Sequence, residues 1–171
     1  MRSIAGKNIV LIGFMGTGKT EVGKLLAASL NRRLVDTDQT IVETEGRPIT
    51  EIFAQEGERY FRRLETAVIE QLCQQRGLVI PTGGGAILDP HNVALLQASG
   101  LVIWLDASVA ELERRLAHDQ SRPLLTGETG VGELYQQRQA AYRQAAHERV
   151  DTTAKPPLAV VAEIMAIIRK N

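Results

Sequence analysis

The segment 13–20 has the residue types and spacing of a phosphate-binding loop. It reads G-F-M-G-T-G-K-T and fits the pattern G-x-x-x-x-G-K-[ST]. Glycines let backbone N–H groups converge on phosphate oxygens, and the start of the following helix adds its positive dipole end. In such a loop Lys19 reaches the β- and γ-phosphates of a nucleotide, and the Thr20 hydroxyl binds Mg²⁺. The residues expected to contact the nucleotide here are Gly16, Thr17, Gly18, Lys19 and Thr20.

Two carboxylates, Asp36 and Asp38, follow the predicted strand 33–36 in the sequence D-T-D. In open α/β sheets the ligand crevice lies at the carboxyl ends of the strands. Asp36 could hold the water shell of a metal opposite Thr20, and Asp38 could accept the proton of a substrate hydroxyl. The alternative is that Asp38, which precedes helical residues, only caps a helix. Beside a phosphate-binding loop, we favour a functional role for at least one of the two.

Two arginines stand on helix faces that are otherwise apolar. Arg62 is in register with Ile69, and Arg138 is in register with Leu134 and Ala141. Burying a guanidinium without an anion is costly, so both arginines need partners. Internal salt bridges would satisfy them, and so would a carboxylate ligand gripped by their planar forks. Position alone favours neither alternative.

Three consecutive glycines, Gly83, Gly84 and Gly85, follow the predicted strand 78–81. A triple glycine can serve simply to turn the chain. It can also bring the backbone close to a ligand, where any side chain would leave no room. The carboxyl end of a strand is compatible with both interpretations.

The segment 118–129 is polar and shows little apolar periodicity between two predicted helices. Most such connections are simply solvated. In a phosphoryl-transfer enzyme, however, a lid that carries an arginine closes over the site, excludes water and neutralises the transferred charge. Arg122 is the candidate for that arginine.

Short apolar runs alternate with longer helical periods along the chain. Residues 8–12 form a continuous aliphatic run, as expected for a strand buried on both faces. Ser108 and Glu111 have the spacing of a capping box at a helix start. The alternation predicts a parallel sheet with helices on both faces, and it gives the loop 13–20 a strand before it and a helix after it. The predicted strands are 8–12, 33–36, 78–81, 101–105 and one near 150, and the predicted helices are 19–30, 39–44, 49–55, 58–75, one from 90, one from 109, one to about 148 and 158–169.

Length and composition are those of an ordinary globular domain. The chain has 171 residues, of which 44% are hydrophobic and 23% charged. Twenty basic residues balance twenty acidic ones, and aromatic residues make up only 4%, which argues against a nucleic-acid or membrane-surface partner. The single cysteine, Cys73, cannot form an internal disulfide, and no stretch is long and apolar enough to span a bilayer. We expect a cytoplasmic monomer.

Taken together, these motifs resemble those of the shikimate kinase family. The phosphate-binding loop is common to many families, but the further set D-T-D, F-R-x-x-E, G-G-G and R-P-L-L is much more specific. The resemblance covers nearly the whole chain, with the motifs in order. They occupy residues 13–20, 36–38, 61–65, 83–85 and 122–125.

The resemblance implies an α/β fold, the three-layer α/β/α P-loop NTPase fold of the nucleoside-monophosphate-kinase type, with a five-stranded parallel sheet. Residues 1–171 would form one kinase domain, with a lid at about 115–128 and substrate-binding helices at about 38–75. It further implies ATP- and Mg²⁺-dependent phosphorylation of the 3-hydroxyl of shikimate to shikimate 3-phosphate, on the pathway to chorismate and the aromatic amino acids.

The resemblance also implies roles for individual residues. Shikimate would be bound by Asp38, Arg62, Gly83, Gly84, Gly85 and Arg138, with Asp38 also the catalytic base. Lys19 and the lid arginine Arg122 would act on the phosphates, Arg115 would lie near the adenine, and Thr20 and Asp36 would bind the metal. Glu21 stands where the family usually has Ser or Thr, and we expect its carboxylate to turn outward. The family often shows R-x-P-L-Y where this chain reads R-Q-A-A-Y from Arg138.

Two other functions are compatible with parts of the pattern. A kinase for another small hydroxy acid, such as gluconate, would share the loop and the strand–helix alternation, but it would leave the arginines and the triple glycine harder to explain. A regulatory guanine-nucleotide switch would need the motifs N-K-x-D and D-x-x-G, and neither occurs in the sequence.

Overall fold

The computed structural model describes residues 6–117 and 130–170, and it contains a parallel sheet of five strands. The strand order across the sheet is β2-β3-β1-β4-β5, and every neighbouring pair is parallel. The predicted five-stranded parallel sheet is therefore confirmed. The strands are β1 (Asn8–Ile12), β2 (Arg33–Leu34), β3 (Leu78–Pro81), β4 (Gly100–Asp106) and β5 (Glu148–Asp151).

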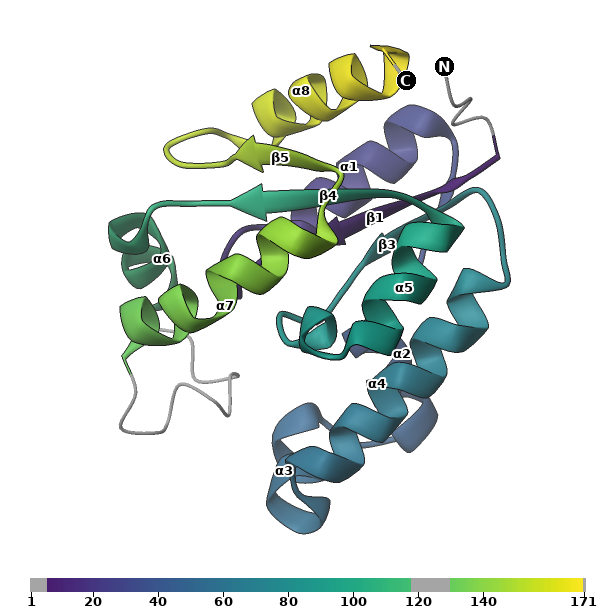
Figure 1. Cartoon of the computed structure of the whole chain (residues 1–171), viewed down its shortest axis with the longest axis vertical. Coiled ribbons are helices and arrows are strands. Elements are labelled where there is room, and N and C mark those ends of the chain that lie inside the picture. Colours follow the sequence, from purple (N-terminus) through teal and green to yellow (C-terminus); the bar gives the residue numbers. More distant parts are fainter. Residues whose placement is uncertain (1–5, 118–129, 171) are drawn as a thin grey trace.

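Helices cover both faces of this sheet (Figure 1). Helices α1 and α8 lie against one face, and most of the others lie on the opposite side (Figure 1). The helices are α1 (Lys19–Leu30), α2 (Thr37–Glu45), α3 (Ile49–Glu56), α4 (Glu58–Cys73), α5 (Pro90–Ser99), α6 (Val109–Leu116), α7 (Val131–Ala145) and α8 (Pro157–Lys170), with a short 3₁₀ turn, η1 (Ala86–Leu88).

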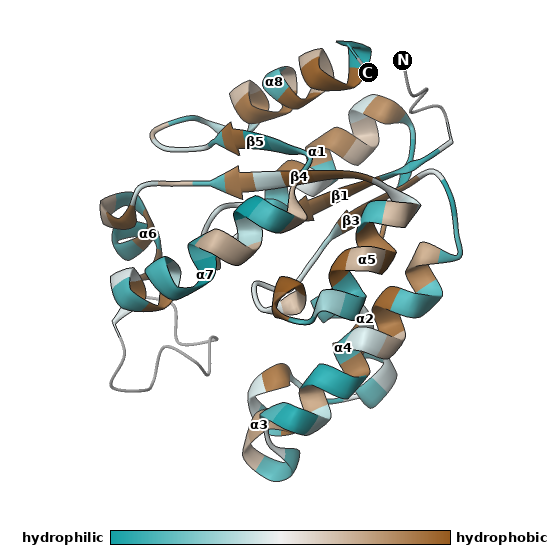
Figure 2. Cartoon of the chain, viewed as in Figure 1, coloured by the Kyte–Doolittle hydropathy of each residue, from teal (hydrophilic) through white to brown (hydrophobic). Residues whose placement is uncertain are grey.

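The central strand β1 contributes side chains to two separate hydrophobic cores, one on each face of the sheet. Ile9 and Leu11 pack in the core under α1 and α8, while Val10 and Ile12 pack in the core on the other face. This division follows from the strand period of two, which turns successive side chains to opposite faces. All four side chains are fully buried, and β1 and β4 are largely hydrophobic in Figure 2, unlike β5 at the edge of the sheet. The expectation of a strand buried on both faces is confirmed.

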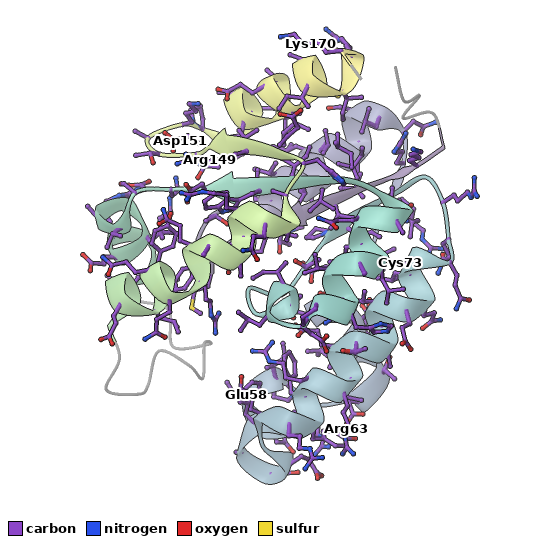
Figure 3. All side chains as sticks on the ribbon, in the orientation of Figure 1. Glu58, Arg63, Cys73, Arg149, Asp151 and Lys170 are labelled. Atoms are coloured by element: carbon purple, nitrogen blue, oxygen red, sulfur yellow. The ribbon has the colours of Figure 1, made fainter. Side chains whose placement is uncertain are left out.

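Helices α2, α3 and α4 form a projection beside the sheet (Figure 1). Its outer end carries charged side chains, among them Arg63, which lies away from the sheet (Figure 3). Arg59 is exposed as well, whereas Arg62 is partly buried. The three arginines thus divide between a solvated face and the edge of the apolar stripe, as the helical register predicts.

Helix α2 begins at Thr37, two residues before the predicted start, because Asp36 caps it. The Asp36 carboxylate accepts hydrogen bonds from the backbone N–H groups of Asp38 and Gln39. The interpretation of Asp38 as the cap was therefore wrong, and Asp38 is left inside the first turn. Strand β2 is also shorter than predicted, since the chain leaves the sheet to form this cap.

Only half of the predicted capping box at the start of α6 forms. Ser108 Oγ accepts a hydrogen bond from Glu111 N–H at 3.3 Å, which caps the helix. The Glu111 carboxylate does not return to Ser108, because it binds Arg114 and Arg115 instead. The Ser108 N–H donates to Thr153 Oγ1. Two guanidinium partners outcompete one backbone N–H for this carboxylate.

No helix in the ranges 6–117 and 130–170 is long and apolar enough to cross a bilayer. Within the same ranges, no three histidine, cysteine or acidic side chains gather as a metal site would require.

The Ser108 cap should contribute measurable stability. Ser108→Ala is expected to lower the free energy of unfolding by about 1 kcal/mol, because α6 then loses the acceptor for an N-terminal N–H group. Ser29→Ala is the control, since Ser29 lies on α1 and its hydroxyl only bonds back to Leu25 O. Urea unfolding of both variants measures the difference. Equal stability of Ser108→Ala and the unaltered protein would contradict the cap.

Candidate active site

The phosphate-binding loop joins β1 to α1 and is held in a preformed shape. Gly16 and Gly18 have φ values of 82° and 87°, a conformation that side-chain-bearing residues rarely adopt. The Lys19 ammonium donates to Gly13 O at 2.7 Å and to Phe14 O at 2.9 Å, so it lies over the loop. The side chain of Thr17 is buried and its hydroxyl donates to Phe14 O at 2.8 Å. Thr17 therefore shapes the loop from the inside.

The hydroxyl of Thr20 and the carboxylate of Asp36 lie together at the mouth of the loop. Thr20 Oγ1 donates to Asp36 Oδ2 at 2.8 Å, across the gap between α1 and the end of β2. The pair faces a cavity of about 760 Å³ that also reaches Asp38 and the triple glycine at Gly84, whereas Arg62 and Arg138 are not among its lining residues. Among the residues that line the cavity are Gly16, Gly18, Lys19, Thr20, Asp36, Asp38, Thr82, Gly84 and Arg115.

Two carboxylates converge on Gly83. A Cβ atom on Gly83 would lie 2.7 Å from Asp38 Oδ1 and 2.7 Å from Glu65 Oε2, so a larger residue would push these carboxylates out of their observed positions. The Gly83 N–H donates to Thr37 Oγ1 at 3.0 Å and is thereby engaged within the protein. Gly85 is crowded in the same way, because its Cβ would clash with the Arg62 guanidinium. The triple glycine thus allows a close approach rather than only a turn.

Glu65, the glutamate of the F-R-x-x-E motif, is a completely buried carboxylate for which the sequence suggested no role. Arg62 Nη1 donates to Glu65 Oε1 at 2.8 Å, and Arg62 Nη2 pairs with Glu58 at 3.1 Å. The other oxygen, Glu65 Oε2, has no hydrogen-bond partner within the described ranges. Burial raises the pKa of Glu65, the Arg62 charge opposes this rise, and the Asp38 charge adds to it. The sequence carries one sign of this burial, since Glu65 stands four residues after Phe61 and shares its helix face.

Arg138 is buried on α7 and is satisfied differently from Arg62. Its guanidinium lies 5.9 Å from the centre of the Phe14 ring, in the phosphate-binding loop. In the described part of the chain no carboxylate forms an ion pair with it. Arg62 therefore has two ion-pair partners within α4 and keeps a partly exposed guanidinium, while Arg138 presents a buried cation beside the phosphate-binding loop.

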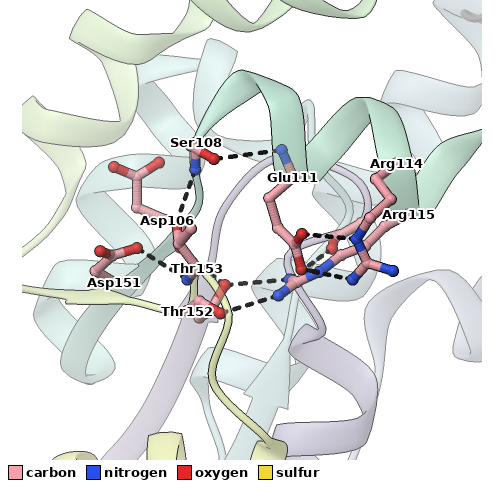
Figure 4. A network of polar contacts seen from close by, with 9 residues as sticks. Asp106, Ser108, Glu111, Arg114, Arg115, Asp151, Thr152 and Thr153 are labelled. Atoms are coloured by element: carbon pink, nitrogen blue, oxygen red, sulfur yellow. Dashed lines mark hydrogen bonds and ion pairs between the residues drawn. The ribbon is translucent and has the colours of Figure 1, made fainter.

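Arg115 is fixed beside the phosphate-binding loop by a network at the carboxyl end of the sheet (Figure 4). Its guanidinium donates to Glu111 at 2.7 Å, to Gly16 O at 3.1 Å and to Thr152 O at 2.9 Å. The hydrogen bond from Arg114, assisted by Arg115, lowers the pKa of Glu111 to about 2. Glu111 thus stays ionised and holds Arg115 at the edge of the cavity.

Two further expectations concern residues around the cavity. Glu21 is exposed at the rim and pairs with Lys24 at 3.7 Å, so its carboxylate turns outward as expected. Arg122 and the rest of the segment 118–129 lie outside the described residues. The lid and its arginine therefore stay predictions from the sequence.

The fold and this cavity are those of the P-loop kinases. Proteins of this class have a parallel sheet and a phosphate-binding loop between its first strand and first helix, as here between β1 and α1. They also have a lysine over that loop and a hydroxyl–carboxylate pair at its mouth, here Lys19 with Thr20 and Asp36.

Within this class the chain belongs to the shikimate kinase family, whose model matches residues 15–169. It is 44% identical over 166 residues to the shikimate kinase of Sulfurihydrogenibium sp., covering 96% of this chain and 99% of that protein. It superposes on a shikimate kinase from Acinetobacter baumannii in complex with shikimate with a TM-score of 0.93, at 36% identity, over 98% of this chain and 96% of that one. A gluconokinase from Sinorhizobium meliloti matches with a TM-score of 0.62 at 21% identity, over 99% and 94% of the two chains, which shows the fold alone.

The low pKa of Glu111 makes its contribution to stability depend on pH. A carboxylate whose pKa is lower in the folded than in the unfolded protein stabilises the fold above the unfolded pKa and loses that effect as the pH falls. The melting temperature of the unaltered protein should exceed that of Glu111→Gln at pH 7, and the gap should shrink as the pH falls from about 5 toward about 2. Glu113→Gln, an exposed position on α6, is the control. A gap that is constant with pH would contradict the assignment.

Proposed function

We propose that this chain transfers the γ-phosphoryl group of ATP to the 3-hydroxyl of shikimate and releases shikimate 3-phosphate. The observation that carries the proposal is the single cavity shared by the phosphate-binding loop, Asp38 and the triple glycine, with Arg62 beside it. The names of the relatives and the shikimate bound to the Acinetobacter protein support this choice of substrate.

The phosphate end of the cavity would bind ATP and its metal. Lys19 would exchange its bonds to loop carbonyls for the β- and γ-phosphates, and Arg115 would lie near the adenine. Thr20 and Asp36 offer oxygen ligands side by side, which is the donor type that Mg²⁺ prefers. When bound, Mg²⁺ neutralises phosphate charge. Arg122 stays a sequence-based proposal for a further contact to the phosphates.

The other end of the cavity would position the acceptor. Asp38 would accept the proton of the reacting hydroxyl, since its carboxylate lies between the loop and the triple glycine. Arg62 and Arg138 would bind the shikimate carboxylate, with Gly84 and Gly85 offering backbone N–H groups. Glu65 would orient Arg62 through the hydrogen bond at 2.8 Å. Holding the two substrates in line accounts for much of the catalysis in reactions of this type.

The proposal extends to the state of the protein. We expect one kinase domain, acting as a cytoplasmic monomer that uses neither nucleic acid nor a membrane as partner. Elution on size exclusion at the volume of an 18.7 kDa chain would agree with the monomer, and elution at twice that mass would contradict it.

Lys19 provides the first test of the phosphate end. Lys19→Ala is expected to lower kcat for shikimate-dependent ADP release by at least about 10²-fold, because the positive charge that stabilises the reacting phosphates is lost. Lys24→Ala, an exposed lysine on the same helix, should keep its activity. Circular dichroism verifies that both variants are folded. Normal turnover by folded Lys19→Ala would contradict the assignment.

Arg62 provides the test of the acceptor end. Arg62→Ala is expected to weaken shikimate binding about tenfold to hundredfold in calorimetry and to change ATP binding little, because hydrogen bonds to a charged group are lost. The exposed neighbour Arg63→Ala is the matched control. Since Arg62→Ala also leaves Glu65 buried without its counterion, Arg62→Lys is measured beside it. Equal weakening of both ligands would assign Arg62 to structure instead.

A further inference from the structure

We infer that Tyr142 is a positioning residue for the acceptor substrate, because its hydroxyl fixes the orientation of the peptide between Gly84 and Gly85. The Tyr142 hydroxyl donates a hydrogen bond to the Gly84 carbonyl oxygen, across 58 residues of sequence. That carbonyl and the Gly85 N–H belong to the same rigid peptide plane. The inference rests on the proposed function, in which this N–H faces the shikimate carboxylate.

Of the three glycines, only Gly84 needs a hydrogen bond of this kind to fix its orientation. Gly83 is wedged between two carboxylates and Gly85 lies against Arg62. A Cβ on Gly84 would meet its nearest neighbours at 3.4 to 3.6 Å, which is ordinary contact distance. Crowding therefore does not fix Gly84, and a peptide flanked by two glycines rotates at little steric cost.

Rotation of this peptide would change the charge presented to a ligand. In the observed orientation the Gly84 carbonyl points to Tyr142. The Gly85 N–H, on the opposite side of the same peptide plane, therefore points away from Tyr142. The N–H groups of Gly84 and Gly85 make no hydrogen bond within residues 6–117 and 130–170. A flipped peptide would replace a donor by a carbonyl oxygen, which repels an anion. The Tyr142 hydroxyl selects the orientation that an anion requires.

Tyr142 is itself held rigidly enough for this role. It is completely buried on α7, and its ring stacks on Trp104 with the centroids 5.9 Å apart and the planes inclined by 18°. Arg149 covers Trp104 in turn, at 5.0 Å. Burial raises the pKa of the Tyr142 hydroxyl, although the Arg138 charge opposes the rise, so the group stays a hydrogen-bond donor at physiological pH.

The position of Tyr142 on α7 also joins the two parts of the proposed carboxylate site. Arg138 stands four residues earlier, so the two side chains lie on the same face of the helix. The hydrogen bond to Gly84 thus ties the helix that carries Arg138 to the loop that follows β3. Substrate binding would find the arginine and the backbone donors already aligned.

The test is Tyr142→Phe, which removes the hydroxyl and keeps the ring. We expect KM and Kd for shikimate to rise about twofold to tenfold, as for the loss of one hydrogen bond, while KM for ATP stays unchanged. Tyr135→Phe is the matched control: it lies on the same helix, and its hydroxyl donates to Asp106 at 2.6 Å instead of to the triple glycine. This control should leave KM for shikimate unchanged even where it lowers the melting temperature.

A second readout needs no catalysis. In protein labelled with ¹⁵N-glycine, Tyr142→Phe should shift or broaden the amide resonance of Gly85 more than that of Gly83, which Thr37 holds. Unchanged Gly85 signals together with an unchanged KM for shikimate would overturn the inference, as would equal rises of KM for shikimate and ATP. If the unaltered protein neither binds nor phosphorylates shikimate, the proposed function fails, and the glycine spectra then decide the Tyr142 contact alone.

Discussion

The ion pair between buried Glu65 and partly buried Arg62 constrains everything around it. A carboxylate removed from water must be paired, and this one reaches from α4 to Gly83, just after the carboxyl end of β3. The pair lies against both ends of the triple glycine, so a side chain at Gly83 or Gly85 would displace Glu65 or Arg62 from the observed arrangement. It also turns the Arg62 fork toward the loop rather than into solvent. The need to compensate the Glu65 charge thereby places Arg62 on the same face of α4 and brings both side chains against the triple glycine.

The parallel sheet makes this assembly of distant residues possible. Because all strands run in the same direction, the loops after β1, β2, β3 and β4 open on the same edge. Each loop brings a different kind of group: backbone N–H groups, carboxylates, glycines and, through the helix after β4, a guanidinium. The two hydrophobic cores hold the strands rigidly, so the groups at that edge need little reorganisation to meet a ligand.

Sequence reasoning succeeded where the signal is local. The strand 8–12, the loop 13–20 and the alternation of elements depend on neighbouring residues, and all three agree with the structure. The ion-pair partners of Arg62 are local too, since Glu58 and Glu65 stand four residues before it and three residues after it on the same helix. The complete burial of Glu65 could not be predicted from this spacing, because it depends on packing against residues far away in the sequence. The capping box was wrong in its second half because Arg114 and Arg115, three and four residues after Glu111, attract its carboxylate away from Ser108. The bond from Tyr142 to Gly84 joins two motifs with no periodic relation.

The stack of Tyr142 on Trp104 has an optical consequence. Trp104 is the only tryptophan in the chain, it is 1% exposed, and its indole Nε1 has no hydrogen-bond partner in the described ranges. An indole shielded from water in this way emits at short wavelength, and its emission moves to longer wavelength when water reaches it. The Tyr142 ring that stacks on Trp104 carries the hydroxyl that binds Gly84 in the triple glycine. The intrinsic fluorescence of the protein is therefore a built-in reporter of packing directly behind the site, without any added label.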